Sequence, residues 1–173
     1  MFGAAAIALM NSDRHGDLLA DGRWLATMLP EWGVAEPGPI GGDELDEFRR
    51  LRALLRRLTE ALGRGGLSAA DIAAFNEVIS STPVRVRLVP DGRRYVLDMT
   101  PLAEGWCEYA VREVAGSFGA MLRADPTRLK ICAGPGCGTV FRDETRSRTR
   151  TWCDSRSCGN RARVRRHRAG LRS

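Results

Sequence analysis

Hydrophobic positions in the first 125 residues follow mainly helical spacing. The clearest case is a run of apolar residues at intervals of three and four: Leu45, Phe48, Leu51, Leu55, Leu58 and Leu62. This run predicts a long amphipathic helix. An earlier helix should end near Pro30, and a later one should begin at Ser68, since Ser68 and Asp71 form a capping-box pattern. Its buried stripe should be Ile72, Phe75 and Ile79.

After Pro83 the hydrophobic period changes from helical to two residues. Apolar residues alternate with polar ones over 84–88 and again over 95–99, and Pro90-Asp91-Gly92 between them favours a turn. We therefore predict a β-hairpin over 84–99. Thr100-Pro101 then predicts the start of another helix, with threonine as N-cap and proline in the first turn.

These elements predict an α+β fold: a mostly helical N-terminal domain with one hairpin (residues 1–128) and a small C-terminal module (129–173). The charge divides at the same point. Residues 1–128 hold 15 Arg and 18 acidic residues, a net charge of −3, whereas residues 129–173 hold 11 Arg and Lys130 against three acidic residues, a net charge of +9. An acidic body with a basic tail is typical of proteins that contact a polyanion.

Composition and motifs exclude several classes of protein. The chain has 173 residues, of which 43% are hydrophobic, enough for a packed core. Its longest apolar segment, residues 2–10, is far shorter than the roughly 20 residues of a membrane span, and it lacks the features of a signal peptide. We therefore expect a cytoplasmic protein. No sequence motif of a hydrolase, metalloprotease or P-loop enzyme occurs, so we expect no enzymatic activity.

Four of the five cysteines are clustered as two pairs, Cys132-x4-Cys137 and Cys153-x4-Cys158, separated by fifteen residues. Two such pairs predict a structural Zn²⁺ site with four thiolate ligands and no open position for catalysis. The alternatives are an iron–sulfur cluster, two disulfides, or unrelated buried thiols. The fifth cysteine, Cys107, lies on an apolar helical stripe and is predicted to be a core residue.

The cysteine region resembles the CGNR zinc finger. The resemblance rests on the residues around both pairs, 132–138, 141–143 and 151–153, and on Cys158-Gly159-Asn160-Arg161, followed by a basic stretch over 162–168. The preceding domain is similar to the ABATE-type helical domain, through residues 7–12 and the order helix, hairpin, helix. The resemblance implies a bacterial transcription regulator, sometimes described as stress-induced. Thr151 departs from the expected pattern, which has an arginine there; Arg150 stands one position earlier.

Within the module we expect a treble-clef-like finger: a knuckle, a hairpin within residues 138–152, and the second cysteine pair at the start of a helix over 159–168. Phe141 and Trp152 should form its miniature core. Four thiolates and one Zn²⁺ lower the charge of the module from +9 to about +7. That charge favours a polyanion as the partner. The cysteine spacing and the resemblance to the CGNR finger narrow the favoured partner to double-stranded DNA, with RNA or an acidic protein as alternatives.

The candidate nucleic-acid-binding residues come from the inter-pair loop and the last helix. They are Arg142, Arg146, Arg148, Arg150, Asn160, Arg161, Arg163, Arg165, Arg166 and Arg168. The arginines over 49–57, by contrast, are predicted to form a solvated helix face. For the helical domain we consider a homodimer contact and a small-molecule effector, with Asn11 as the candidate ligand-binding residue.

Overall fold

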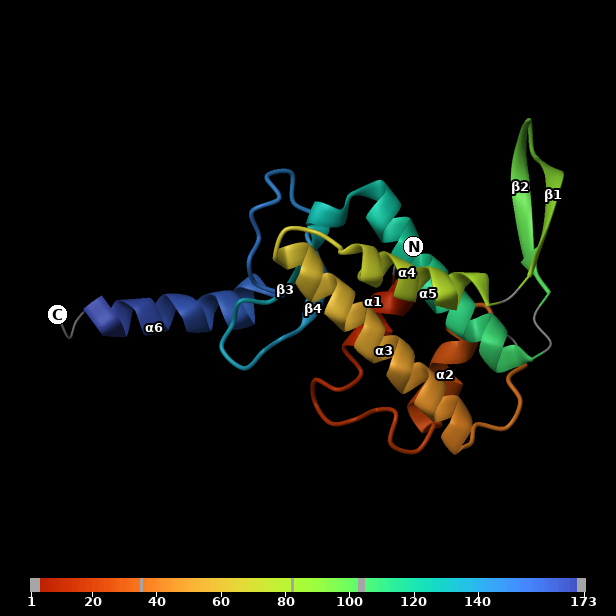
Figure 1. The fold of residues 1–173 in the computed structure, drawn as a ribbon. Coiled ribbons are helices and arrows are strands. Elements are labelled where there is room, and N and C mark those ends of the chain that lie inside the picture. The colour runs from red at the N-terminus through yellow and green to blue at the C-terminus, as the bar shows by residue number, and fades with distance from the viewer. Residues whose placement is uncertain (1–3, 35, 82, 103–104, 171–173) are drawn as a thin grey trace.

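The computed structural model describes residues 4–34, 36–81, 83–102 and 105–170. It contains six α-helices, two pairs of strands and two short helical turns within these ranges (Figure 1). They are α1 (Ala4–Met10), α2 (Arg23–Glu31), α3 (Gly42–Gly63), α4 (Ala69–Ser80), β1 (Val84–Asp91), β2 (Arg94–Pro101), α5 (Trp106–Ala124), η1 (Pro126–Arg128), β3 (Leu129–Ile131), β4 (Val140–Arg142), η2 (Ser155–Gly159) and α6 (Asn160–Gly170).

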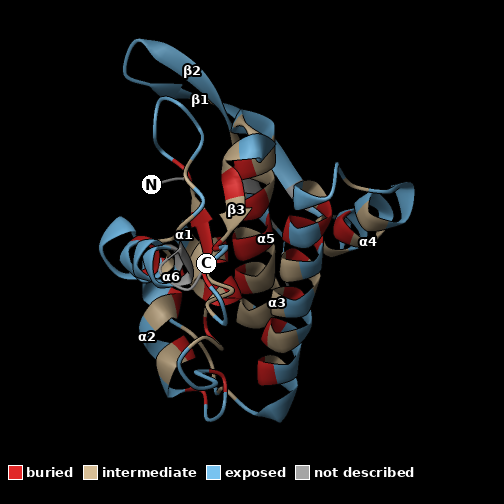
Figure 2. Cartoon of the chain, turned by 90° about the vertical axis from the view of Figure 1, so that its left-hand side faces the viewer, coloured by how far each residue is buried: buried red, intermediate tan, exposed pale blue. Residues whose placement is uncertain are grey.

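The hydrophobic core lies where α1, α3 and α5 pack together, and Figure 2 shows the buried residues on their facing sides. Phe48 and Leu55 of α3 and Phe118 of α5 are fully buried there. The helical periodicity of residues 45–62 therefore predicted α3 correctly. The capping box of α4 is also confirmed, because Ser68 Oγ accepts a hydrogen bond from Asp71 N at 3.1 Å and Asp71 Oδ2 accepts one from Ser68 N at 3.1 Å. Only Phe75 of its expected stripe is buried, however, and Ile72 is about half exposed.

Strands β1 and β2 form the expected hairpin, with Leu88 opposite Leu97 and Asp91 opposite Arg94. Its turn is the two-residue loop that follows Asp91, where Gly92 adopts a positive φ of 61° as such tight loops require. Pro90 lies inside the strand instead of in the turn. In the part of the chain that the structure describes, no helix is long and apolar enough to cross a membrane.

The prediction of a helix starting at Thr100-Pro101 was wrong. Strand β2 runs through Pro101, which pairs with Val84, and Leu102 N donates to Pro83 O at 2.8 Å. This pairing keeps the backbone extended, and α5 begins only after Gly105. A proline that suits the first turn of a helix also suits the edge of a two-stranded sheet, so the sequence did not distinguish the two.

The second sheet also differs from the prediction. A hairpin was expected within residues 138–152, but the strands that pair are β3 and β4, with Lys130 opposite Phe141. The first cysteine pair therefore lies in the loop of this hairpin. Leu129 and Val140 are buried in the same cluster as the helices, so the small sheet packs directly on the helical body. The domain boundary at residue 129 remains a prediction from composition.

Candidate metal centre

The first cysteine pair sits on the tight loop between β3 and β4. Cys132 N donates to Thr139 O at 2.8 Å and Cys137 N donates to Gly134 O at 3.0 Å, which closes the loop on itself. Gly134 is required by space, since a Cβ there would lie 3.3 Å from Cys158 Sγ and 3.4 Å from Cys132 Sγ. The loop thus brings both sulfurs to one side with little room for other side chains.

The second pair lies where the chain enters α6. Asp154 caps the η2 turn, because its carboxylate accepts a hydrogen bond from Arg156 N at 2.9 Å. Cys158 is buried near the end of this turn, directly before α6 begins at Asn160. A knuckle on a hairpin facing a second pair at a helix start is the arrangement of a treble-clef-like finger, as predicted.

The four sulfurs of Cys132, Cys137, Cys153 and Cys158 lie within 4.8 Å of one another. Cys153 Sγ is 3.7 Å from both Cys137 Sγ and Cys158 Sγ. Tetrahedral ligands bound at about 2.3 Å stand about 3.8 Å apart, so the spacing fits one tetrahedral metal ion. It does not fit disulfides, whose sulfurs are bonded, and it leaves no room for a multi-iron core between the four thiols.

The charge of the site also calls for a cation. The Thr139 hydroxyl, 3.1 Å from Cys137 Sγ, lowers the pKa of Cys137 to about 6. Burial, together with the neighbouring thiols, raises the pKa of Cys153 to about 12. Four thiolates this close cannot all be ionised without positive charge between them. Arg161 supplies part of that charge, since its Nη2 lies 3.0 Å from Cys158 Sγ.

A small apolar cluster surrounds the thiols. Phe141 is buried against Cys132 and Cys158, and Trp152 packs on the same group. The prediction that these two aromatic residues form the core of the finger is confirmed. Arg150 completes the cluster: its guanidinium lies 5.1 Å from the centre of the Phe141 ring, and it donates to the carbonyl oxygens of Trp152 and Cys153. Arg150 therefore stabilises the turn that carries the second cysteine pair. It lies next to Thr151, the residue that differs from the family pattern.

Asp143 organises the loop between the pairs, a role the sequence analysis missed. Its side chain is fully buried and accepts hydrogen bonds from Lys130 Nζ at 2.8 Å, Thr145 N at 3.0 Å and Arg150 N at 2.9 Å. Burial alone would raise the pKa of Asp143, but these donors, Lys130 foremost, lower it well below its usual range. Lys130 also donates to the carbonyl oxygens of Arg148 and Arg150. The only lysine of the chain thus holds residues 143–150, which we call the arginine loop, in place.

The remaining loop arginines differ in their surroundings. Arg148 pairs with Asp125 at 3.1 Å, and Arg142 lies 4.0 Å from Glu144. Arg146 is exposed at the tip of the loop. Of the four loop arginines proposed to contact nucleic acid, Arg150 is thus turned inward and Arg148 is held by an acidic side chain.

The last helix carries the greatest density of basic residues. Helix α6 projects away from the body, and the views of Figures 1 and 2 agree in leaving most of its surface exposed. Asn160, Arg161, Arg163, Arg165 and Arg168 are exposed, and the helix contains no acidic residue. The side chain of Arg166 lies outside the described residues. Arg156, exposed in η2 beside these arginines, was not among the predicted residues.

Three polar side chains of the helical body form hydrogen bonds with main-chain groups of residues 137–140, at the end of the first cysteine loop. Asn11 Nδ2 donates to Val140 O at 2.8 Å, and Asn11 Oδ1 accepts from Val140 N at 2.8 Å. Arg56 donates to Met10 O at 2.7 Å and to Gly138 O at 3.1 Å, while Arg14 donates to Cys137 O at 3.4 Å. The finger is therefore tied to the body through main-chain groups beside its ligands.

These contacts correct the prediction for the arginines of residues 49–57. Arg50 and Arg57 are exposed as expected, but the side chains of Arg52 and Arg56 are only 12% and 16% exposed. Arg52 pairs with Asp17 at 2.7 Å, and Arg56 reaches the knuckle. Burial lowers the pKa of Arg56, although its carbonyl partners still favour the charged form. Part of this basic helix face thus joins α3 to other segments of the same chain instead of facing solvent.

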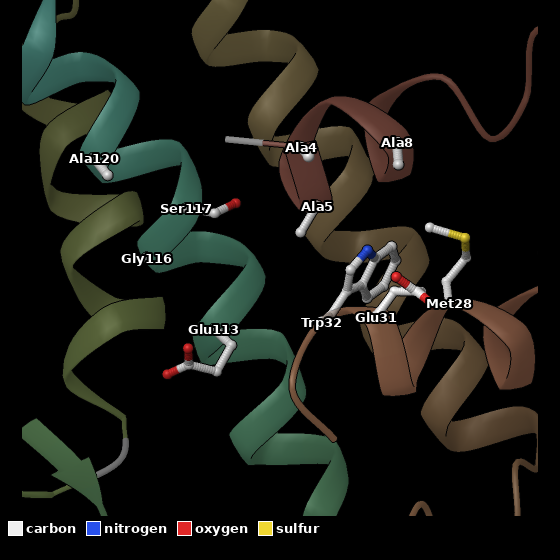
Figure 3. A pocket seen from close by; sticks show the side chains of 10 residues that line it. All are labelled: Ala4, Ala5, Ala8, Met28, Glu31, Trp32, Glu113, Gly116, Ser117 and Ala120. Carbon is white, nitrogen blue, oxygen red and sulfur yellow. The ribbon is translucent and has the colours of Figure 1, made fainter. Parts of the chain in front are cut away.

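A cavity of about 700 Å³ lies between α1, α2 and α5 (Figure 3). Alanines of α1 and the Trp32 ring line its apolar side, and the carboxylates of Glu31 and Glu113 stand at its edge. Asn11, the candidate ligand-binding residue, does not line this cavity. Its amide is engaged with Val140 instead.

Fold and site together define the class: a zinc-finger protein with a helical N-terminal region. Residues 128–170 match the family model of the CGNR zinc finger, and residues 3–125 match the ABATE model, described as "putative stress-induced transcription regulator". Because the second match covers more than half of the chain, the protein belongs to the ABATE family. A search of curated proteins gave no match.

Proposed function

We propose that this protein is a DNA-binding transcription regulator and that one structural Zn²⁺ holds its finger together. The single observation that carries the proposal is the placement of α6: an exposed helix with only basic charges leaves directly from the four-thiolate site. The family description supports the regulatory role.

Zinc is the ion that suits this donor set best. Four thiolates in tetrahedral geometry are a common structural zinc site, whereas hard cations such as Mg²⁺ require oxygen ligands. With all four positions held by Cys132, Cys137, Cys153 and Cys158, the ion has no free position for substrate. Its role is therefore to stabilise a module whose own apolar cluster is small. Native mass spectrometry should find one zinc per chain, and Cys158→Ser should lose it.

Helix α6 suits the major groove of DNA in both size and charge. The groove admits one α-helix, and arginine side chains can bind phosphate oxygens or the edge of guanine. In isolation this helix is disfavoured, because Arg165 and Arg168 are like charges three residues apart and the helix contains no acidic residue. Phosphates along the groove would relieve that repulsion. We therefore expect DNA to increase the helicity of α6.

Binding assays with zinc-loaded full-length protein test the proposal. A labelled DNA duplex, an RNA duplex of the same sequence and polyglutamate should bind in that order of decreasing affinity. The triple variant Arg163→Glu/Arg165→Glu/Arg168→Glu should lose at least about 100-fold in DNA affinity. The control Arg23→Glu/Arg50→Glu/Arg85→Glu makes the same charge change at exposed arginines of the body. Equal losses in both variants, or tighter binding to RNA or polyglutamate, would contradict DNA recognition by α6.

We further propose that the cavity between α1, α2 and α5 binds a small-molecule effector. Helix α1 lines the cavity and leads directly to Asn11, which holds Val140 of the finger, so occupancy could reach the knuckle. Thermal-shift screening should find a metabolite that stabilises the protein without changing its zinc content. Ala5→Trp would fill the cavity and should abolish that shift. A shift that persists in this variant would place the ligand elsewhere.

A further inference from the structure

The β1–β2 hairpin is an arm without a partner in the described part of its own chain. It stands away from the helices in Figure 1, and none of the hairpin side chains that the structure describes, those of residues 85–98, belongs to either hydrophobic cluster. Two-stranded hairpins are at best marginally stable in water when nothing packs on them. This hairpin has eight residues in each strand. We therefore expect a contact outside the described part of the chain to stabilise it.

The two faces of the arm differ sharply. Residues opposite each other, and residues two apart along a strand, share a face. The register therefore puts Val86 and Leu88 of β1 on the same face as Tyr95 and Leu97 of β2. These side chains are 54%, 65%, 72% and 64% exposed. We call this set the apolar face of the arm.

The opposite face is mostly polar. It carries Arg85 and the ion pair between Arg87 and Asp98 at 3.2 Å, with Asp91 opposite Arg94 near the turn. One cross-strand valine pair, Val89 and Val96, also lies on this face, and Val96 is 43% exposed. The larger apolar side chains and the greater exposed apolar area are on the other face.

We propose that the apolar face docks on the same face of a second copy of this chain. The face carries no charge among its described residues, so its complement must also be apolar, and a second arm provides such a surface. Its four exposed side chains present on the order of 500 Å². Two arms packed face to face can bury at most about 1,000 Å², which lies at the threshold for a specific interface.

The geometry favours a two-fold arrangement. Face-to-face packing of identical patches is self-complementary and closes at two copies without requiring a second docking surface on the body. Because the arm projects from the body, a second copy can approach it without meeting the helices. The polar faces, with Arg87 and Asp98, then lie outside a small two-layer sandwich. This inference concerns the free protein and does not depend on DNA binding.

Sedimentation velocity of the zinc-loaded full chain over a range of concentrations tests the interface. Wild type should be a dimer in the micromolar range. Leu97→Asp should weaken dimerisation at least about 100-fold, because the two-fold axis buries two new charges against apolar surface. The matched control is Val96→Asp, the neighbouring residue on the opposite face, which should leave the dimer intact. Circular dichroism and zinc content should stay unchanged in both variants, since the arm lies outside the core.

Photo-crosslinking identifies the occupant directly. A benzophenone side chain at position 95, in place of Tyr95, should give covalent dimers that join this position to residues 84–101 of the second copy. A wild-type protein that stays monomeric at all concentrations would overturn the proposal. So would equal weakening by Val96→Asp, or crosslinks that join the arm to a helix of the second copy or to a different protein.

Discussion

Replacement of Asn11 by alanine should destabilise the whole protein, because Asn11 acts as an edge partner for β4. Cys132 N donates to Thr139 O and Asp143 N donates to Arg128 O. The main-chain groups of Thr139 and Asp143, on either side of β4, therefore point toward the chain of β3. In an antiparallel pair the hydrogen-bonding direction alternates, and Val140 therefore points its N–H and C=O away from β3. The Asn11 amide meets both groups at 2.8 Å.

The magnitude follows from what Asn11→Ala leaves behind. Val140 is 1% exposed, so its two main-chain groups lose their partners in a buried position. Each unsatisfied group costs about 1–3 kcal/mol, which gives about 2–6 kcal/mol of lost stability in total. For a chain of this size, at about 2–4 °C for each kcal/mol, that corresponds to a fall in Tm of roughly 4–24 °C.

Urea denaturation, followed by circular dichroism for the helices and by tryptophan fluorescence, measures the effect. Asn76→Ala is the matched control, since Asn76 is exposed on α4 and should change stability by less than about 0.5 kcal/mol. A loss below about 0.5 kcal/mol for Asn11→Ala would refute the reasoning. So would two separate transitions, because the hydrogen bonds from Asn11, Arg14 and Arg56 predict that finger and body unfold together.

Three further predictions concern the thiols and the arginine loop. Zinc binding by metal-free protein at pH 7 should release protons, and the zinc affinity should rise with pH. The reason is that the pKa of Cys153, raised to about 12, keeps this thiol protonated until the metal binds. A zinc affinity, measured by chelator competition, that is independent of pH would contradict this. Burial, with Glu44 and Glu47 nearby, raises the pKa of Cys107 to about 11, so at pH 8 only about 0.1% is thiolate. Its alkylation by iodoacetamide should then be far slower than that of glutathione, and equal rates would refute the assignment. Asp143→Ala should free residues 143–150 and increase protease cleavage after Arg146 and Arg148, whereas Glu144→Ala, at an exposed neighbour, should not; unchanged cleavage in Asp143→Ala would contradict the role of the buried carboxylate.

The sequence predicted those parts of the molecule that depend on local pattern. The three- and four-residue spacing over 45–62 defines α3, and the cysteine spacing predicts the cluster of four thiols because each pair needs only one tight turn. The capping box before α4 and the alternation in β1 and β2 are equally local. In each case the sequence pattern and the structure that it predicts involve the same short segment of the chain.

The remaining features depend on tertiary partners that no local pattern reveals. Strand β3 is three residues long, too short to show a period, so the hairpin of the finger was assigned to the wrong segment. The arginines of α3 look alike in sequence, yet Arg49, Arg52 and Arg56 bond to distant segments of the chain. Arg50 and Arg57 stay exposed. Asn11 likewise takes its role from Val140, which is 129 residues away in the sequence.

The central claim is that α6 binds DNA through its arginines, and the salt dependence of binding tests it most directly. Fluorescence anisotropy of a labelled duplex with zinc-loaded full-length protein should show log K falling linearly with log salt concentration, by roughly 0.9 for each phosphate contact. The variant Arg163→Glu/Arg165→Glu/Arg168→Glu should reduce this slope by about 2 to 3, and the body control should leave it unchanged. Affinity that does not vary with salt, or a slope that is the same in wild type and the α6 variant, would contradict the account.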